Sequence, residues 1–228
     1  MPRMLVQVAW RWLCGLLLAS LLTPLQADEN GSLRYPRRAD GDEFRSVYAL
    51  AQLQLALDKA GSPLRLEPSH YSMEQERALV NLERNAHLDV AWSMTSIERE
   101  QRLLPVRIPL DKGLFGWRIA LLSKDRAQLL KDVRNLADLR QFSAGQGHDW
   151  PDSAILRSHD LPVKVSSSYG SLFRMLQAQR FDYFPRSVIE IWDELEHPRG
   201  RHLVADSHVL LHYPTALYFF FSRQRPDL

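Results

Sequence analysis

Along the first half of the chain, apolar side chains recur first with the period of a helix and then with the period of a strand. Between Glu43 and Lys59 they return every three or four residues until Gly61, which predicts a well-buried helix. The apolar positions of this helix are Phe44, Val47, Tyr48, Leu50, Ala51, Leu53, Leu55 and Leu57. Apolar and charged residues alternate over 64–68, so that segment reads as a half-buried strand. A brief strand is also expected over 33–36.

The same two periods continue to the end of the chain. Ser72 with Gln75, and Ser187 with Glu190, have the spacing of a capping box before a helix. Strands are expected over 89–93, 115–123, 142–144, 163–165, 181–184, 202–205 and 215–222, and helices over 72–86, 127–133, 136–140, 151–158, 169–176 and 187–195. Strands and helices alternate on both sides of Gly113, which indicates an α/β fold with two units. No Pro/Gly/Ser-rich linker separates the units, so we expect strands that pass directly between them.

The first 27 residues differ in composition from the rest. Arg3 and Arg11 precede an apolar run from Trp12 to Leu22, and Ala27 is a small residue at a cleavable position. This pattern predicts a secretory signal peptide and therefore an exported protein. The run is shorter than the ~20 apolar residues that a spanning helix needs; an uncleaved anchor is the alternative. The one cysteine, Cys14, lies in this segment, so the mature chain needs no disulfide.

Charge and motif content exclude several classes of function. The formal net charge of +2 disappears with the leader, which carries two arginines and no acidic residue. A neutral mature chain lacks the basic footprint that nucleic acid requires. The sequence has no G-x-S-x-G or H-E-x-x-H motif and no thiol beyond the leader, so we predict neither an enzyme nor a cofactor. His208 and His212 lie in an extended segment that separates them by ~13 Å, and no metal site is predicted.

The segment from Asp89 to Pro109 has the most distinctive chemistry. A short buried strand ends at the hydroxyls of Thr95 and Ser96, and Arg99 follows. In α/β proteins, ligands bind at the carboxyl ends of strands, and a guanidinium group can meet a carboxylate with two hydrogen bonds. The alternative is that Arg99, in the mixed-charge run 98–102, belongs to a solvated helix face.

This segment, followed by a second α/β unit and a late return strand, resembles the bacterial extracellular solute-binding proteins of family 3, which have the type 2 periplasmic-binding-protein fold. The resemblance covers nearly all of 28–228. It implies two lobes, each a mixed sheet flanked by helices, with a cleft between them. Lobe 1 would comprise 28–112 and 209–228, and lobe 2 would comprise 113–208. The family continues past the last strand with one or two helices, so lobe 1 is expected to close differently or the chain to be shortened.

The resemblance also assigns residues of the first lobe to the cleft. Arg99 matches the arginine that pairs with the ligand carboxylate, and Thr95 and Ser96 match the hydroxyl positions beside it. Tyr35 falls where the family often places an aromatic wall. Trp92 replaces a small residue and could narrow the cleft floor or stack on the solute; the alternative is a core tryptophan.

Two positions of the second lobe depart from the family pattern. The loop 145–147 replaces a Gly-Thr or Gly-Ser pair, and Gly147 could present backbone N–H groups to an anion or simply form a tight turn. Arg186 stands where amino-acid binders place an aspartate for the ligand ammonium, although it could equally start a helix. An arginine there would repel an amine. An anionic or polar solute without a free amine is therefore expected.

The resemblance implies a periplasmic, monomeric protein that captures a small molecule and passes it to an ABC permease. A sensory module of the same fold, acting with a membrane receptor, is the second interpretation. A periplasmic enzyme with an unrecognised site is the third.

Overall fold

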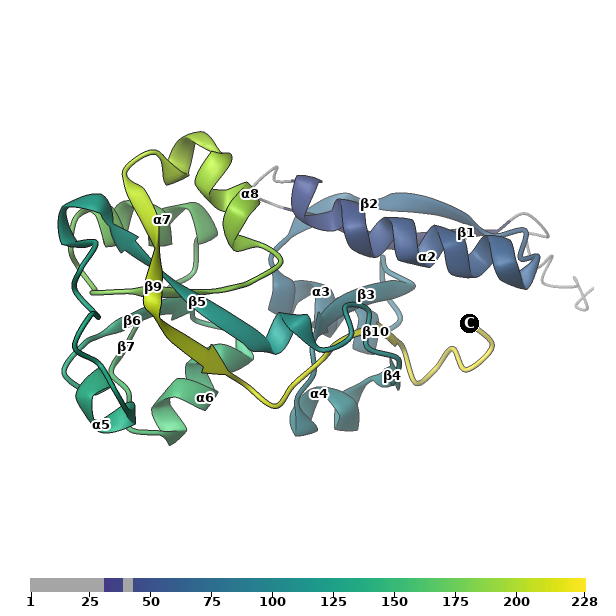
Figure 1. Cartoon of the computed structure of the whole chain (residues 1–228). Helices are drawn as coiled ribbons and strands as arrows, with labels where there is room; N and C mark the ends of the chain where they lie inside the picture. The colour runs from purple at the N-terminus through teal and green to yellow at the C-terminus, as the bar shows by residue number, and fades with distance from the viewer. Residues whose placement is uncertain (1–30, 39–42) are drawn as a thin grey trace, which may run out of the picture.

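The computed structural model describes residues 31–38 and 43–228, and the predicted signal peptide lies outside this part of the chain. Figure 1 shows two lobes, which the chain visits in the order first, second, first. The first lobe contains β1 (Ser32–Arg38), the 3-10 helix η2 (Glu43–Ser46), α2 (Val47–Ala60), β2 (Arg65–Met73), α3 (Gln75–Glu83), β3 (Val90–Met94), α4 (Ile97–Arg102), β4 (Leu104–Val106) and β10 (Leu217–Phe221).

The second lobe is built from the segment between β4 and β10. It contains η3 (Leu114–Gly116), β5 (Trp117–Ser123), η4 (Lys124–Arg126), α5 (Leu136–Leu139), β6 (Ala144–Gly147), α6 (Pro151–Ser158), β7 (Val163–Ser166), α7 (Tyr169–Gln177), β8 (Phe184–Ser187), α8 (Ile191–Glu196), η5 (Pro198–Gly200) and β9 (Leu203–His212). β9 stays paired with β5 as far as His212, which lies beyond the boundary at 208 proposed from the sequence.

The first lobe is held together by strand pairs of both directions. β1 and β2 are parallel, whereas β10 lies between β3 and β4 and is antiparallel to both. The β1–β2 pair and the β3-β10-β4 sheet meet at Arg34 and Asp89. The Asp89 backbone N–H donates to the Arg34 carbonyl over 2.9 Å, and Arg34 donates from Nε and Nη2 to the Asp89 carboxylate. Burial alone would raise the pKa of Asp89, but the hydrogen bonds from Arg34 hold it below its ordinary value.

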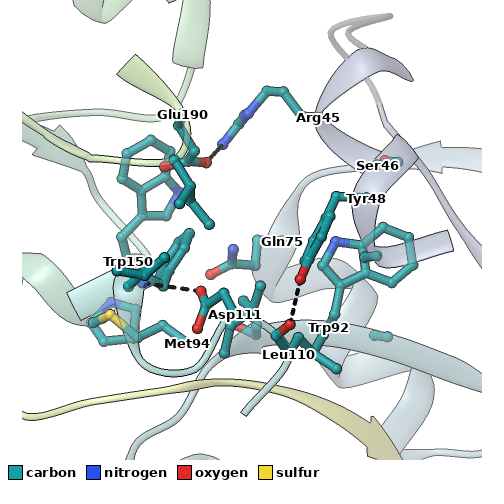
Figure 2. Close-up of a pocket in the computed structure, with 18 of the residues that line it drawn as sticks. Arg45, Ser46, Tyr48, Gln75, Trp92, Met94, Leu110, Asp111, Trp150 and Glu190 are labelled. Carbon is teal, nitrogen blue, oxygen red and sulfur yellow. Dashed lines mark hydrogen bonds and ion pairs between the residues drawn. The ribbon is translucent and has the colours of Figure 1, made fainter. Parts of the chain in front are cut away.

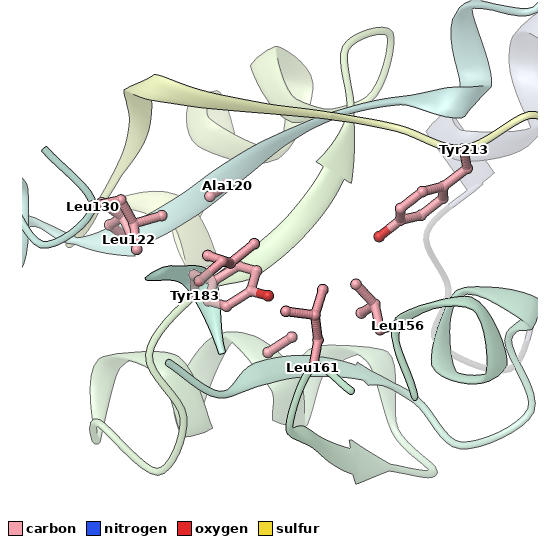
Figure 3. Close-up of a cluster of buried hydrophobic side chains, with 9 residues drawn as sticks. Ala120, Leu122, Leu130, Leu156, Leu161, Tyr183 and Tyr213 are labelled. Carbon is pink, nitrogen blue, oxygen red and sulfur yellow. The ribbon is translucent and has the colours of Figure 1, made fainter. Parts of the chain in front are cut away.

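The second lobe has a central antiparallel sheet of order β8-β5-β9 and a parallel pair, β6 with β7. One core cluster of the lobe contains Leu122, Leu156, Tyr183 and Tyr213, as Figure 3 shows. The other core cluster surrounds α7, and Phe173 is among its buried members. The apolar residues that predicted strands and helices over 115–205 therefore supply the two core clusters of the second lobe.

The helix predicted over 43–59 forms, as η2 followed by α2, but the prediction that it is well buried is wrong. Ala49 and Leu53 are buried, and they pack on the first-lobe sheet. Val47 and Leu55 remain 63% and 51% exposed. The helix has apolar residues all around, but only one face contacts a sheet (Figure 1).

Other predictions missed local details. Residues 127–133 form turns rather than a helix. Neither predicted capping box forms: the N-cap residues of α3 and α8 are Glu74 and Glu190, and neither caps its helix with a side-chain hydrogen bond. Ser72 instead belongs to β2, which continues to Met73. Within residues 31–38 and 43–228, no helix is long and apolar enough to cross a membrane.

Candidate binding cleft

A cavity of about 880 Å³ lies between the two lobes, a volume typical of a small-molecule site. Its first-lobe wall comes from η2, α2, α3 and β3, and its second-lobe wall from β5, α6 and α8 with their flanking loops. Figure 2 shows side chains of both lobes facing this space. The cavity therefore has the place that a solute would occupy in a two-lobe binding protein.

Aromatic side chains form part of the first-lobe wall. Trp92, on β3, is half-buried and lines the cavity. Tyr35 is not among the lining residues but lies against Trp92, with the ring centroids 6.3 Å apart. Tyr48 also lines the cavity, and its hydroxyl donates to the Leu110 carbonyl over 2.7 Å. Trp92 and Tyr48 thus contribute aromatic side chains to the first-lobe wall, whereas Tyr35, the residue predicted to form an aromatic wall, contacts Trp92 and does not line the cavity.

Arg99 is buried at the edge of this wall and does not line the cavity. Its guanidinium donates to Ser93 Oγ, to the Met94 carbonyl, to Gln75 Oε1 and, across the lobes, to the Asp149 carbonyl. The last three of these hydrogen bonds are each 3.0 Å long. Burial lowers the pKa of Arg99 from its ordinary value. All four acceptors are neutral oxygens, and the nearby carboxylates, with Glu76 and Asp149 first among them, act on the guanidinium only through space.

The two hydroxyls predicted beside Arg99 serve the first turn of α4. Ser96 Oγ accepts a hydrogen bond from the Arg99 backbone N–H over 3.2 Å, and Thr95 Oγ1 donates to Glu100 Oε1 over 2.6 Å. Neither residue lines the cavity. The structure places Thr95, Ser96 and Arg99 together behind the cavity wall.

Arg186 lies in the second-lobe wall, and its charge is compensated. It is 2% exposed, donates from Nε and Nη2 to Glu194, and donates from Nη2 to Glu190 Oε2 over 2.9 Å. Burial alone would raise the pKa of Glu190, but Arg186, Arg45 and Arg118 hold it at about 2. The argument that Arg186 must repel an amine therefore fails, because two carboxylates lie against the guanidinium.

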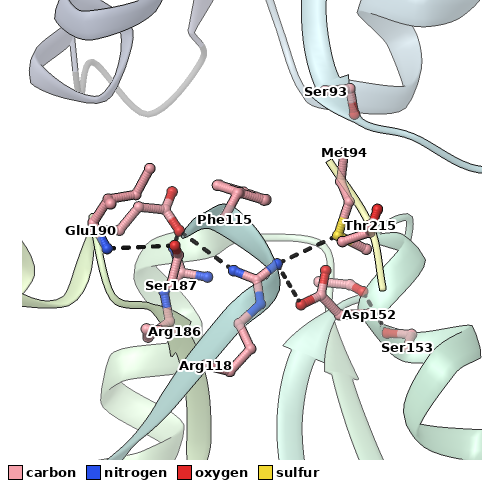
Figure 4. Close-up of polar contacts among 12 residues, drawn as sticks. Ser93, Met94, Phe115, Arg118, Asp152, Ser153, Arg186, Ser187, Glu190 and Thr215 are labelled. Carbon is pink, nitrogen blue, oxygen red and sulfur yellow. Dashed lines mark hydrogen bonds and ion pairs between the residues drawn. The ribbon is translucent and has the colours of Figure 1, made fainter. Parts of the chain in front are cut away.

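Sequence reasoning missed Arg118, a buried arginine of β5. It is 1% exposed and lines the cavity. Its Nη2 lies 3.0 Å from Asp152 Oδ1 and 3.4 Å from the Met94 sulfur of the opposite lobe (Figure 4). Its guanidinium also covers the Phe115 ring at 4.4 Å. The available signal was a single arginine inside the apolar strand 115–123, which needs a buried partner.

Gly147 supports the wall without lining it. A Cβ at this position would collide with the indole ring of Trp150, and Trp150 does line the cavity. The Gly147 carbonyl accepts a hydrogen bond from Ser153 Oγ over 2.8 Å. The glycine thus allows Trp150 to fold over the end of β6.

The charges around the cavity balance. Among the described residues that line it, the cationic ones are Arg38, Arg45, Lys112, Arg118 and Arg186, and the acidic ones are Asp111, Asp152, Glu190, Asp193 and Glu194. The cavity therefore suits a polar solute better than one of high net charge. In the part of the chain that the structure describes, no cluster of three or more His, Cys, Asp and Glu side chains is placed to hold a metal ion.

No protein-family model and no curated protein matches the sequence, but solved structures match most of the chain. A protein of Wolinella succinogenes DSM 1740, assigned as the binding component of an ABC transporter and complexed with lysine, is 16% identical with a TM-score of 0.62; the match covers 86% of this chain and 84% of that one. A Salmonella typhimurium periplasmic binding protein with high arginine specificity is 11% identical, with coverages of 86% and 88% and a TM-score of 0.60.

A third match is the GluR0 ligand-binding core of Nostoc punctiforme in complex with glutamate. It is 12% identical, covers 86% of each chain and has a TM-score of 0.58. The chain has the two-lobe fold of the family 3 solute-binding proteins. At identities of 11 to 16%, the likeness establishes the fold alone, and both the role and the solute have to be argued from the cleft.

Proposed function

We propose that this chain is an exported solute-binding protein, which captures a small polar solute in the interlobe cavity and delivers it to an ABC importer. The observation that carries the proposal is the cavity itself, because it is bounded by both lobes and combines aromatic side chains with balanced charges. Proteins of the same fold have been solved in complex with a small solute, one with lysine and another with glutamate.

We further propose that an anionic group of the solute binds Arg99 when the lobes separate. In this structure one donor of Arg99 is taken by the Asp149 carbonyl of the opposite lobe. Opening the cleft would release that donor, and a carboxylate would supply the counter-charge that the neutral acceptors do not. Thr95 and Ser96 then act by shaping α4, while Trp92 and Arg186 face the solute from opposite walls.

A thermal-shift screen tests the proposed function. The purified protein is heated with dicarboxylates, amino acids, small peptides and sugars. A ligand at one hundred times its dissociation constant adds ~2.7 kcal/mol, and each kcal/mol raises the melting temperature by ~2 to 4 °C at this chain length. One class of solute should therefore give a clear shift.

A pair of tryptophan variants locates the bound solute. Trp92→Ala removes a side chain that lines the cavity, whereas Trp192→Ala removes one that is 56% exposed on α8 and outside the lining. The solute shift should shrink in Trp92→Ala and persist in Trp192→Ala. An unchanged shift in Trp92→Ala, or no shift with any solute class, would count against the proposal.

A sensory role is the second candidate, favoured by the likeness to the GluR0 ligand-binding core of Nostoc punctiforme. Deleting the gene separates the two roles once the solute is known. Loss of solute uptake indicates transport, whereas intact uptake with loss of the cellular response indicates sensing. We expect the solute to be recovered chemically unchanged, and NMR of the incubated mixture checks this; conversion would indicate an enzyme.

A further inference from the structure

Arg45 belongs to the first lobe, yet its guanidinium lies against the second. It sits at the end of η2, just before α2, and its side chain is 12% exposed. The guanidinium carbon is 4.0 Å from the centroid of the Tyr169 ring at the start of α7. Its Nη2 is 3.4 Å from Glu190 Oε1, as Figure 2 shows. The Arg45 side chain therefore extends from the first lobe to the second.

The two oxygens of Glu190 are shared between the lobes. Oε2 accepts from Arg186 of the same lobe over 2.9 Å, and Oε1 faces Arg45 of the opposite lobe. A carboxylate edge next to an aromatic face is the combination that binds a planar cation. Glu190 and Tyr169 offer both parts to Arg45, whose guanidinium lies nearer the Tyr169 ring centroid, at 4.0 Å, than those of Arg199 at 5.1 Å and Arg186 at 5.7 Å. Arg45 thus contacts the second lobe as a bound cation would.

Both Arg45 and Glu190 line the interlobe cavity, so this contact lies beside the space proposed for the solute. We propose that Glu190 and Tyr169 form a cation subsite of the second lobe, which Arg45 occupies as a tethered ligand that holds the cleft closed without a solute. The protein's resting state is then a closed one, and a solute enters after Arg45 leaves the subsite.

A second contact between the lobes supports a closed resting state. Asp149 accepts from Arg99 through its carbonyl and from the Glu76 backbone N–H through Oδ2, each over 3.0 Å. This contact uses a different pair of elements, α3 and α4 of the first lobe with the loop before α6. The Arg45 contact differs from the Asp149 contact because its second-lobe partners are a carboxylate and an aromatic ring. These two groups would also bind a free cation.

Small-angle X-ray scattering of the purified protein without solute tests the closing role. Arg45→Ala should raise the radius of gyration, because losing a desolvated cation–π contact lowers the ratio of closed to open molecules by about tenfold or more. Arg107→Ala is the matched control, since Arg107 pairs with Glu100 inside the first lobe and is 67% exposed. An Arg45→Ala protein with the wild-type radius would overturn the proposal.

Methylguanidinium tests the subsite separately. Arg45→Ala should bind it with a saturable change in tryptophan fluorescence, because the vacated subsite adjoins the wall that contains Trp150. Wild-type protein and Arg45→Ala/Glu190→Gln should not respond. Equal responses in all three would refute the cation subsite. Arg45→Lys provides a variant that keeps the charge but loses planar stacking, and it should open partially.

The inference rests on the proposed function only in taking the cavity as the solute site, and neither measurement uses a solute. A failed solute screen with an expanded Arg45→Ala protein would remove the proposed function alone. A positive screen with an unchanged radius would remove this inference alone.

Discussion

At the scale of single residues, the cleft is organised by buried charges that compensate one another. Arg186 and Glu194 are 2% and 1% exposed and lie in direct contact, and Glu190 joins them from the cavity side. Taking such ions out of water is costly unless each is paired and hydrogen-bonded. Arg186, which the sequence suggested as a separate ligand contact, is therefore part of a network with Glu190 and Glu194, and the charges of this network help to decide what the cavity accepts.

The network predicts how stability depends on pH. Three arginines hold the pKa of Glu190 at about 2, below its ordinary 4.5. A lowered folded-state pKa stabilises the protein fully above about pH 4.5, and this stabilisation is lost as the pH falls toward 2. The shift corresponds to about 3 kcal/mol. Urea unfolding from pH 6 to pH 2 should show the difference between wild type and Glu190→Gln shrinking with acid.

Asp193→Asn is the control for that series, because Asp193 is an exposed carboxylate on the same wall. Its difference from wild type should stay small throughout. A Glu190→Gln difference that is constant with pH would show that the arginines do not stabilise the ionised carboxylate.

At the scale of elements, α2 shows the limit of reading burial from composition. All residues over 47–57 except Gln52 and Gln54 are apolar, and a helix that is apolar nearly all round is normally buried. In this lobe only the face with Ala49 and Leu53 packs on the sheet. The opposite face, with Val47 and Leu55, is exposed among the described residues. Helical periodicity was visible in the sequence, but the number of covering elements was not.

Two leucines of α2 make this distinction measurable. Leu53 is 4% exposed and Leu55 is 51% exposed. Leu53→Ala should lower the free energy of unfolding by about 2 to 5 kcal/mol, because it leaves a cavity in the core. Leu55→Ala should change it by about 0.5 kcal/mol or less. Denaturant unfolding measures both, and equal losses would mean that another surface covers Leu55 in solution.

At the scale of the whole molecule, the chain passes from the first lobe to the second before β5 and returns to the first lobe after β9. The Tyr213 backbone N–H donates to the Gly116 carbonyl over 2.9 Å, which ties the outgoing and returning segments together. A Cβ at Gly116 would collide with the Tyr213 carbonyl oxygen. The glycine is needed because the two segments approach so closely, and their contact sets how the lobes face each other.

Gly116→Ala should therefore destabilise the protein by about 1 to 3 kcal/mol, as expected for overpacking, and it should weaken the solute response. Gly170→Ala is the matched control: it lies in α7 with no close atom in the way, so alanine should be neutral or stabilising by up to about 1 kcal/mol. Thermal unfolding with and without solute gives both values. Similar behaviour of the two variants would contradict the role of the crossing.

Most of the fold could be predicted because its signals are local. The strands at 89–93 and 115–123 and the helix at 169–176 have strong periodic patterns, and the structure confirms each within a few residues. The prediction failed where the apolar pattern was short, as at 127–133, where the structure has turns instead of the expected helix. The choice of site residues depended on the family resemblance, which assigned all of them to the cleft. The structure places Trp92 and Arg186 on the cavity wall, and Arg99, Thr95 and Ser96 behind it.

The sequence by itself determined the α/β class, the two units and the chemistry available near Asp89 to Pro109, because periodicity and residue type are properties of neighbouring positions. Only the tertiary structure decided which charges meet. Glu190 lies four residues from Arg186 but 145 from Arg45, and their common contact depends on how the lobes close. A contact between distant segments leaves no periodic trace in either segment, so the cleft had to be seen folded.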